Sequence, residues 1–197
     1  MLAVHRLHRH DLLPAGAVRL ESDIGNVLPG AKLTSPAPFA GLDLTRLRAL
    51  TYRVEGNNLV PYEFAEGEGL ASAGTLTPEF VAEFTGLIGE KGLAGIFALE
   101  IGEFTINPRQ RYTEIEIDGI GTLVAPRDSI ALSGPSTVTS WDVRGYNPEN
   151  SDNDGSTCYQ AIANKNTHKV FTNSLDKSSR SVIGDLVNQG VIKRAQG

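Results

Sequence analysis

Hydrophobic positions along this 197-residue chain occur mostly in short runs, and many of them alternate with polar residues, as is typical of β-strands. The segment Gly56-Asn57-Asn58 separates two such runs and predicts the turn of a hairpin. Strands are therefore expected over residues 2–10, 17–21, 50–55, 59–64, 96–101, 112–118, 122–125, 129–132 and 137–143.

One segment has helical spacing instead. Thr77 can cap a helix that begins at Pro78, and Gly92 can end it. Four apolar residues of this segment recur at i, i+4, i+7 and i+8, which predicts one buried stripe: Phe80, Phe84, Leu87 and Ile88. A second, shorter helix is expected from about Ser181, with Gly190 near its end.

These elements do not alternate regularly between strand and helix, which favours an α+β fold over a parallel α/β fold. We expect a single domain over residues 1–197, built on a mostly antiparallel and barrel-like sheet, with one central and one C-terminal helix. Two stretches rich in turn-forming residues predict loops. Residues 24–44 form a long covering loop in this interpretation, and residues 147–156 form a polar loop.

Composition limits the classes of partner. The formal net charge is −5 and the dense basic stretch spans only residues 6–10, so nucleic-acid binding is not expected. No apolar run is long enough to span a bilayer, so no membrane partner is expected either. Cys158 is the single cysteine and cannot form an intrachain disulfide. With no apolar stretch typical of a signal peptide near residue 1, these features favour a cytoplasmic protein.

Three of the four histidines lie in the first ten residues, as His5, His8 and His10. On a strand, His8 and His10 share one face with about 7 Å between them, while His5 points the other way. Such a pair can act as acid and base, or it can bind zinc, iron or copper with His168 as a third ligand. The alternative is a basic edge strand whose histidines pair with carboxylates such as Asp11.

Two glutamates lie among apolar neighbours. Glu100 interrupts an apolar run, and Glu63 lies between two aromatic residues. A carboxyl group in apolar surroundings can hold a proton near neutral pH, which suits general acid–base catalysis. The alternative to a catalytic role is that each glutamate faces solvent from the polar face of a half-buried strand. A further set of acids alternates with apolar residues and is expected to face solvent without a chemical role: Glu114, Glu116 and Asp118.

The opening run around His8-Arg9-His10 resembles the start of a group of small, uncharacterised fungal proteins, which begin with a His-Arg-His strand and a turn. Here Asp11 stands where those proteins have Phe, and there is one cysteine where they have several. The resemblance implies a fungal origin and an α+β fold and carries no activity. Further segments match later features of those proteins: Thr34-Ser35-Pro36, Tyr62-Glu63-Phe64, the helix at 78–91, Trp141, and in part Cys158 with His168.

These observations favour a small-molecule enzyme of a biosynthetic pathway, with its substrate between the sheet and the loop 24–44. His8 or His10 would be the acid or base, and Glu63 or Glu100 its partner. The chain has no nucleotide-binding glycine fingerprint, so no cofactor is predicted, and an isomerase, lyase or cyclase reaction is favoured. A metal-dependent enzyme with His8 and His10 as ligands is the second hypothesis. A non-catalytic binding or interaction domain, whose first strand pairs with a partner, is the third.

Overall fold

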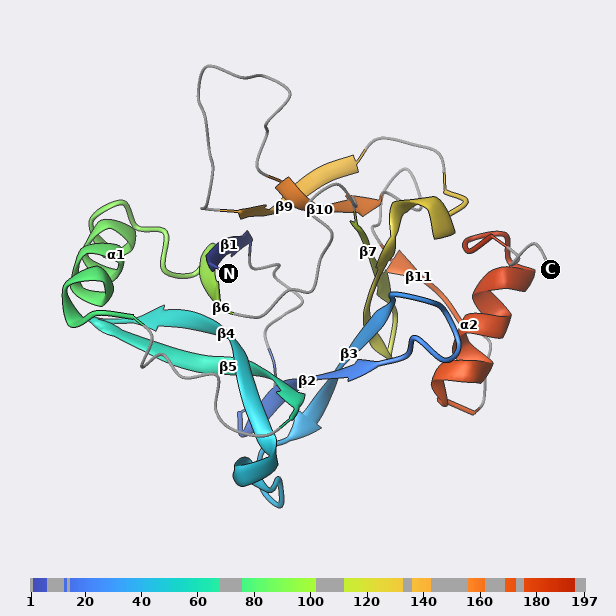
Figure 1. The fold of residues 1–197 in the computed structure, drawn as a ribbon, viewed down its shortest axis with the longest axis horizontal. Coiled ribbons are helices and arrows are strands. Elements are labelled where there is room, and N and C mark those ends of the chain that lie inside the picture. The colour runs from blue at the N-terminus through green and yellow to red at the C-terminus, as the bar shows by residue number, and fades with distance from the viewer. Residues whose placement is uncertain are drawn as a thin grey trace. The chain divides into compact units, whose positions relative to one another are not determined.

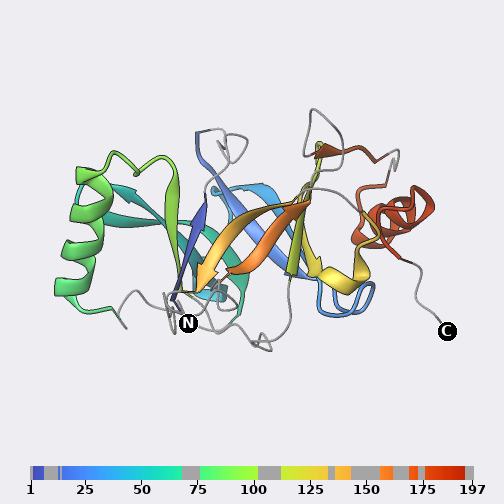
Figure 2. The same ribbon diagram turned by 90° about the horizontal axis from the view of Figure 1, so that it is seen from above.

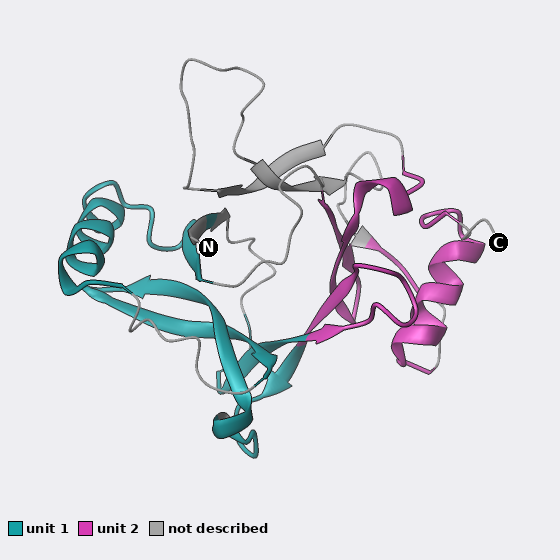
Figure 3. Ribbon diagram, in the orientation of Figure 1, with its two compact units in different colours: residues 1–21, 36–105, 140–156 teal, residues 22–35, 106–139, 157–197 magenta. Residues whose placement is uncertain are grey.

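A computed structural model of the chain describes residues 2–6, 13, 15–67, 76–101, 112–132, 136–142, 156–161, 169–172 and 176–193. Contacts divide the chain into two compact units (Figure 3). Unit 1 comprises Met1–Glu21, Pro36–Thr105 and Ser140–Ser156, and unit 2 comprises Ser22–Ser35, Ile106–Thr139 and Thr157–Gly197. Each unit has its own hydrophobic core.

The strands that lie wholly or partly in unit 1 follow the order β9-β1-β6-β4-β5-β2 (Figure 1), and the unit boundary falls within β9 and within β2. Neighbouring strands are antiparallel, except for the parallel pair β2 and β5. The predicted hairpin is confirmed, because Gly56 adopts the positive φ of 59° that the turn between β4 and β5 requires. The bounds are β1 Leu2–Arg6, β2 Ala17–Asp23, β4 Leu47–Glu55, β5 Asn58–Glu66, β6 Phe97–Ile101 and β9 Ser136–Asp142.

Helix α1 spans Pro78–Glu90 and begins where the sequence predicts. The Thr77 hydroxyl accepts a hydrogen bond of 3.2 Å from the backbone N–H of Phe80, which satisfies one of the free donors of the first turn. Beyond the helix, Gly92 has a φ of 65°. Figures 1 and 2 both show α1 beside the β4–β5 hairpin.

The predicted apolar stripe of α1 is only partly correct. The rings of Phe80 and Phe84 stack with their centroids 6.0 Å apart, and Ile88 is buried. Leu87, however, is 54% exposed, whereas Thr85 is buried. The buried side of the helix is centred near Ile88, which lies about 100° around the axis from Leu87. The prediction for Leu87 was therefore wrong.

One face of the unit 1 sheet carries the hydrophobic core. Phe80 and Phe84 of α1 pack against this core as partly buried residues. The strand side chains on the opposite face alternate with the core residues and point away from this core. The buried core residues are Val18, Leu47, Ala49, Tyr52, Phe64, Leu99 and Ile101.

The strands of unit 2 lie in the order β3-β8-β7-β11, and β10 also pairs with β7. Strand β7 is antiparallel to β8 and parallel to β10 and β11. Helix α2, Ser179–Asn188, contributes Val182, Ile183 and Leu186 to the core of this unit. The strand bounds are β3 Lys32–Pro38, β7 Tyr112–Ile117, β8 Gly121–Pro126, β10 Ser156–Ala161 and β11 Lys169–Val170.

The α+β class, the mostly antiparallel sheet and the two predicted helices are confirmed. The long covering loop over residues 24–44 was wrong, because β3 lies within it and is followed by the 3-10 turn Leu44–Arg46. The prolines of this segment favour a loop because proline has no N–H to donate to a neighbouring strand. Pro36 and Pro38, however, both lie beyond residues 32–34, which are the residues that pair with β8. Residues 147–155 lie outside the described residues, and the assignment of one domain to residues 1–197 stays a prediction.

The expected strand over residues 129–132 was also wrong. The chain there forms a 3-10 turn, Arg127–Ser129, and then one isolated bridge between Ile130 and Ile192. The apolar residues Ile130 and Leu132 are buried or half-buried because the chain after α2 returns beside them, with the N–H of Ala131 bonded to the carbonyl of Val191 at 2.8 Å. Burial in this case does not need a strand.

Candidate functional site

The two glutamates singled out in the sequence lie on either side of one threonine. Thr51 on β4 is the register partner of Glu63 on β5 and of Glu100 on β6. Adjacent strands are about 4.8 Å apart, so the backbones at Glu63 and Glu100 are about 10 Å apart. Both glutamates are half-buried, and Thr51 is only 2% exposed. The structure therefore brings together two of the four predicted catalytic residues.

Thr51 holds one of these carboxylates in place. Its hydroxyl donates a hydrogen bond of 3.0 Å to Oε2 of Glu63. The register of β4 and β5 shifts on both sides of this pair, between Ala49 and Thr51 and again between Thr51 and Tyr52. Such β-bulges redirect individual side chains and are frequent next to active sites. The local irregularity and the hydrogen bond together fix the Glu63 carboxylate.

Further charged residues share this face of the sheet. Arg19 and Glu21 of β2 are the register partners of Glu63 and Ala65, and Arg48 of β4 also pairs with Ala65. Each of them alternates with core residues and so lies on the face opposite the core. All are only partly exposed, and the short Ala65, which lies between Arg48 and Glu21 in the register, is buried. We call this set the charged face: Arg19, Glu21, Arg48, Thr51, Glu63 and Glu100.

The N-terminal histidines are described only in part. His8, His10 and His168 lie outside the described residues, so their predicted roles stay predictions. His5 pairs with Ala98 of β6, next to the row that contains Ala3 and Glu100. Among the residues that the structure describes, no group of three or more His, Cys, Asp or Glu side chains could hold a metal ion.

Strand β1 is not an edge strand. It pairs with β6 through residues 2–6 and with β9 through residues 3–5. The alternative of a basic edge strand was therefore wrong for this segment. A single sequence shows no such pairing, because the partner β9 lies more than 130 residues away along the chain.

Two acids for which the sequence predicted only a solvated role are buried. Glu114 and Glu116 on β7 are 6% and 8% exposed, whereas Asp118 is exposed as expected. Oε2 of Glu114 has no access to solvent and no hydrogen-bond partner among the described residues. The prediction for Glu114 and Glu116 was wrong because alternation separates two faces of a strand but does not tell whether the second face is covered.

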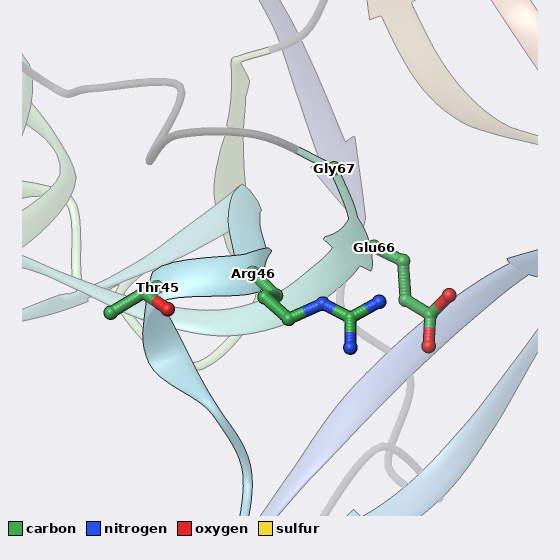
Figure 4. Close-up of a pocket in the computed structure, with 4 residues that line it drawn as sticks. All are labelled: Thr45, Arg46, Glu66 and Gly67. Atoms are coloured by element: carbon green, nitrogen blue, oxygen red, sulfur yellow. The ribbon is translucent and has the colours of Figure 1, made fainter.

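A small hollow lies at the end of the β4–β5 hairpin that is remote from its turn. Its volume is about 460 Å³, and Thr45, Arg46, Glu66 and Gly67 line it. In Figure 4 the Arg46 side chain extends toward Glu66. The N–H of Gly67 donates to the carbonyl of Arg46 at 3.0 Å, which ties the two walls together. Glu66 follows Glu63 by three residues, so its side chain leaves β5 on the other face, and the hollow is separate from the charged face.

One titratable group beside this hollow is perturbed. The Thr45 hydroxyl donates to Oδ1 of Asp43 at 2.6 Å, and the Thr45 N–H donates to the same oxygen at 3.1 Å. These two bonds, the hydroxyl first, hold the pKa of Asp43 below its ordinary value. Asp43 is fully exposed, so its carboxylate orders a surface turn and lies outside the charged face.

Comparisons with protein-family models, curated proteins and solved structures give no match for this chain. The resemblance to small fungal proteins stays a prediction, as does the cytoplasmic location. Within the described part of the chain, no helix has the length and apolar character needed to cross a membrane. The candidate site therefore rests on the geometry of the charged face.

Proposed function

We propose that this chain is a small-molecule enzyme that uses carboxylate acid–base chemistry on the charged face. Glu63 is the base, and Glu100 is the partner that returns a proton. The observation that carries the proposal is the hydrogen bond from the buried Thr51 hydroxyl to Oε2 of Glu63, with Glu100 on the other side of the same threonine. A base must be held in a fixed orientation to accept a proton from a bound molecule.

The distance between Glu63 and Glu100 suits a substrate that lies between their two carboxyl groups. Glutamate side chains reach several ångströms beyond the backbone, so two of them about 10 Å apart at the backbone can both contact one small molecule. A proton removed by Glu63 and one delivered by Glu100 would together give an isomerisation or an elimination. His8 or His10 remains the third candidate acid or base in this proposal.

A metal-dependent variant, with His8 and His10 as ligands and His168 as a third, is the second candidate within the enzyme class. The non-catalytic alternative loses its original support, since β1 is paired on both sides. A binding domain without turnover would still use the same half-buried charged side chains, so activity has to be measured directly.

The test is exchange of carbon-bound protons in D₂O, because a proton-abstracting enzyme incorporates deuterium even when the product is unknown. A panel of small ketones, keto acids and hydroxy acids is incubated with the protein, and loss of the proton signals is followed by NMR. We expect exchange with the wild type, a loss of roughly 100-fold or more in E63Q and E100Q, and a smaller loss in T51V. E83Q on the exposed side of α1 is the matched control.

Two outcomes would contradict the proposal. Undiminished exchange in E63Q would remove Glu63 from the chemistry. No exchange above the buffer rate for any panel member, together with binding of some members by ligand-observed NMR, would favour the non-catalytic binding domain.

A further inference from the structure

Among the described residues of the charged face, Arg48 is the one with a buried side-chain nitrogen or oxygen that lacks a hydrogen-bond partner. It lies on β4 opposite Ala65 and between the core residues Leu47 and Ala49, so its side chain leaves the sheet on the side of Thr51 and Glu63. Ala65 has only a methyl group. The register partner of Arg48 therefore offers no acceptor for its guanidinium group.

The Nε atom of Arg48 is buried and has no hydrogen-bond partner in the described part of the chain. A guanidinium group keeps its charge at all pH values of interest, and a buried donor without an acceptor is costly. The group cannot lose a proton to relieve this cost. An unsatisfied, permanently charged donor beside a candidate active site indicates a missing anionic partner.

The planar shape of the Arg48 guanidinium group indicates which class of anion it binds. The Nε–H and one terminal N–H of a guanidinium lie in one plane and match the two oxygens of a carboxylate. Glu21 and Glu63 lie on the neighbouring positions of the charged face, and they would repel a phosphate dianion more strongly than a carboxylate. A carboxylate therefore fits this surrounding better than a phosphate.

Arg48 and Glu63 are in adjacent rows of the sheet. Ala65, the register partner of Arg48, lies two residues from Glu63 on β5, which is about 7 Å along the strand. An organic acid held by its carboxylate at Arg48 would place its next carbon atoms toward the Glu63 carboxylate. We infer that Arg48 binds the carboxylate group of a small organic acid and orients the neighbouring carbon atoms of that acid toward Glu63. That this acid is the substrate of the enzyme rests on the function proposed above.

The binding step is tested by NMR on ¹⁵N-labelled protein, through the arginine Nε–Hε signals. R48K identifies the Arg48 signal by its loss. Titration with sodium acetate is expected to shift that signal saturably in the millimolar range, while sodium chloride at the same ionic strength does not. The signal of Arg53, which is exposed and paired with Glu55 at 2.6 Å, is the internal control. An acetate shift no larger than the chloride shift overturns the inference, and tighter binding of inorganic phosphate overturns the choice of a carboxylate.

The role in turnover is tested by the exchange assay. R48K is expected to raise KM at least tenfold for panel members that carry a carboxylate and to leave neutral ketones unchanged. If E63Q abolishes exchange but acetate does not bind, the inference about Arg48 fails and the proposed function stands. If acetate binds at Arg48 but the wild type exchanges no panel member, the proposed function fails and Arg48 is an anion site of a binding protein.

Discussion

Glu114 shows, at the scale of single residues, how burial and hydrogen bonding can disagree. It lies on β7 between Val124 of β8 and Gln160 of β10 in the register, and it is 6% exposed. One of its carboxylate oxygens is buried and accepts no hydrogen bond within the described residues. A buried polar atom without a partner lowers stability by about 1–3 kcal/mol, so this residue costs folding free energy.

Replacing Glu114 by leucine is therefore expected to stabilise the protein. E114L removes the unsatisfied oxygen and keeps a side chain of similar length, so the free energy of unfolding should rise by about 1 kcal/mol. Urea denaturation of E114L and of E83L, an exposed control on α1, measures the effect. The control is expected to stay within about 0.5 kcal/mol of the wild type. A fall in stability for E114L would show that the carboxyl group has a favourable partner.

The residue types of the charged face could be predicted only in part. Apolar neighbours in the sequence singled out Glu63 and Glu100, and the structure places both of them beside Thr51 in the sheet. Thr51 and Arg48 were missed, because their importance depends on which strands flank β4. That pairing joins segments up to about fifty residues apart, and no local pattern encodes it. The same limit applies to Glu114, whose neighbours in the sheet come from two other strands, β8 and β10.

Among the elements, the start of β8 is set by a close approach of two backbones. A Cβ atom at Gly121 would overlap the carbonyl oxygen of Thr34 on β3. Only glycine allows this distance, so β3 and β8 can pair there without a shift. Gly121 therefore lets residues 32–34 of β3 pair closely with β8, although prolines follow at positions 36 and 38.

G121A is accordingly expected to destabilise the protein strongly. The methyl group meets backbone atoms that cannot move alone, so we expect a loss of at least about 2 kcal/mol, which urea denaturation would measure. The matched control is G86A in α1, where no atom lies within 4 Å of an added Cβ. Alanine in a helix interior is favoured over glycine by about 1 kcal/mol, so the control should gain stability. Equal effects of the two substitutions would refute the close-approach argument.

The start of α2 is expected to respond to pH. The Ser178 hydroxyl, and then its N–H, lower the pKa of Asp176 below the ordinary value of 3.8. A lowered pKa in the folded state means that ionised Asp176 stabilises the fold above about pH 4, and that this contribution is lost as the pH falls through the lowered pKa. Carbon-detected NMR titration should show a higher pKa for Asp176 in S178A than in S178T, which keeps the hydroxyl. An equal pKa in both variants would contradict the assignment.

For the whole molecule, the notable feature is that two cores are built from interleaved pieces of one chain. Each unit contains three separate segments, and the chain passes from one unit to the other within β2 and again within β3. A sequence pattern cannot show this, because the alternation of apolar residues is the same in both units. Strands that belong to both units are expected to couple the unfolding of one to that of the other.

This coupling can be tested by weakening one core at a time. Leu99 and Leu186 are almost fully buried, one in each core, and L99A and L186A are each expected to cost about 2–5 kcal/mol. Native-state hydrogen exchange then reports which amides lose protection. If the units unfold together, L99A lowers the protection of α2 as much as that of β4, and the chain is one domain in the thermodynamic sense. If protection falls in β4 alone, the units are separate domains in spite of the strands that they share.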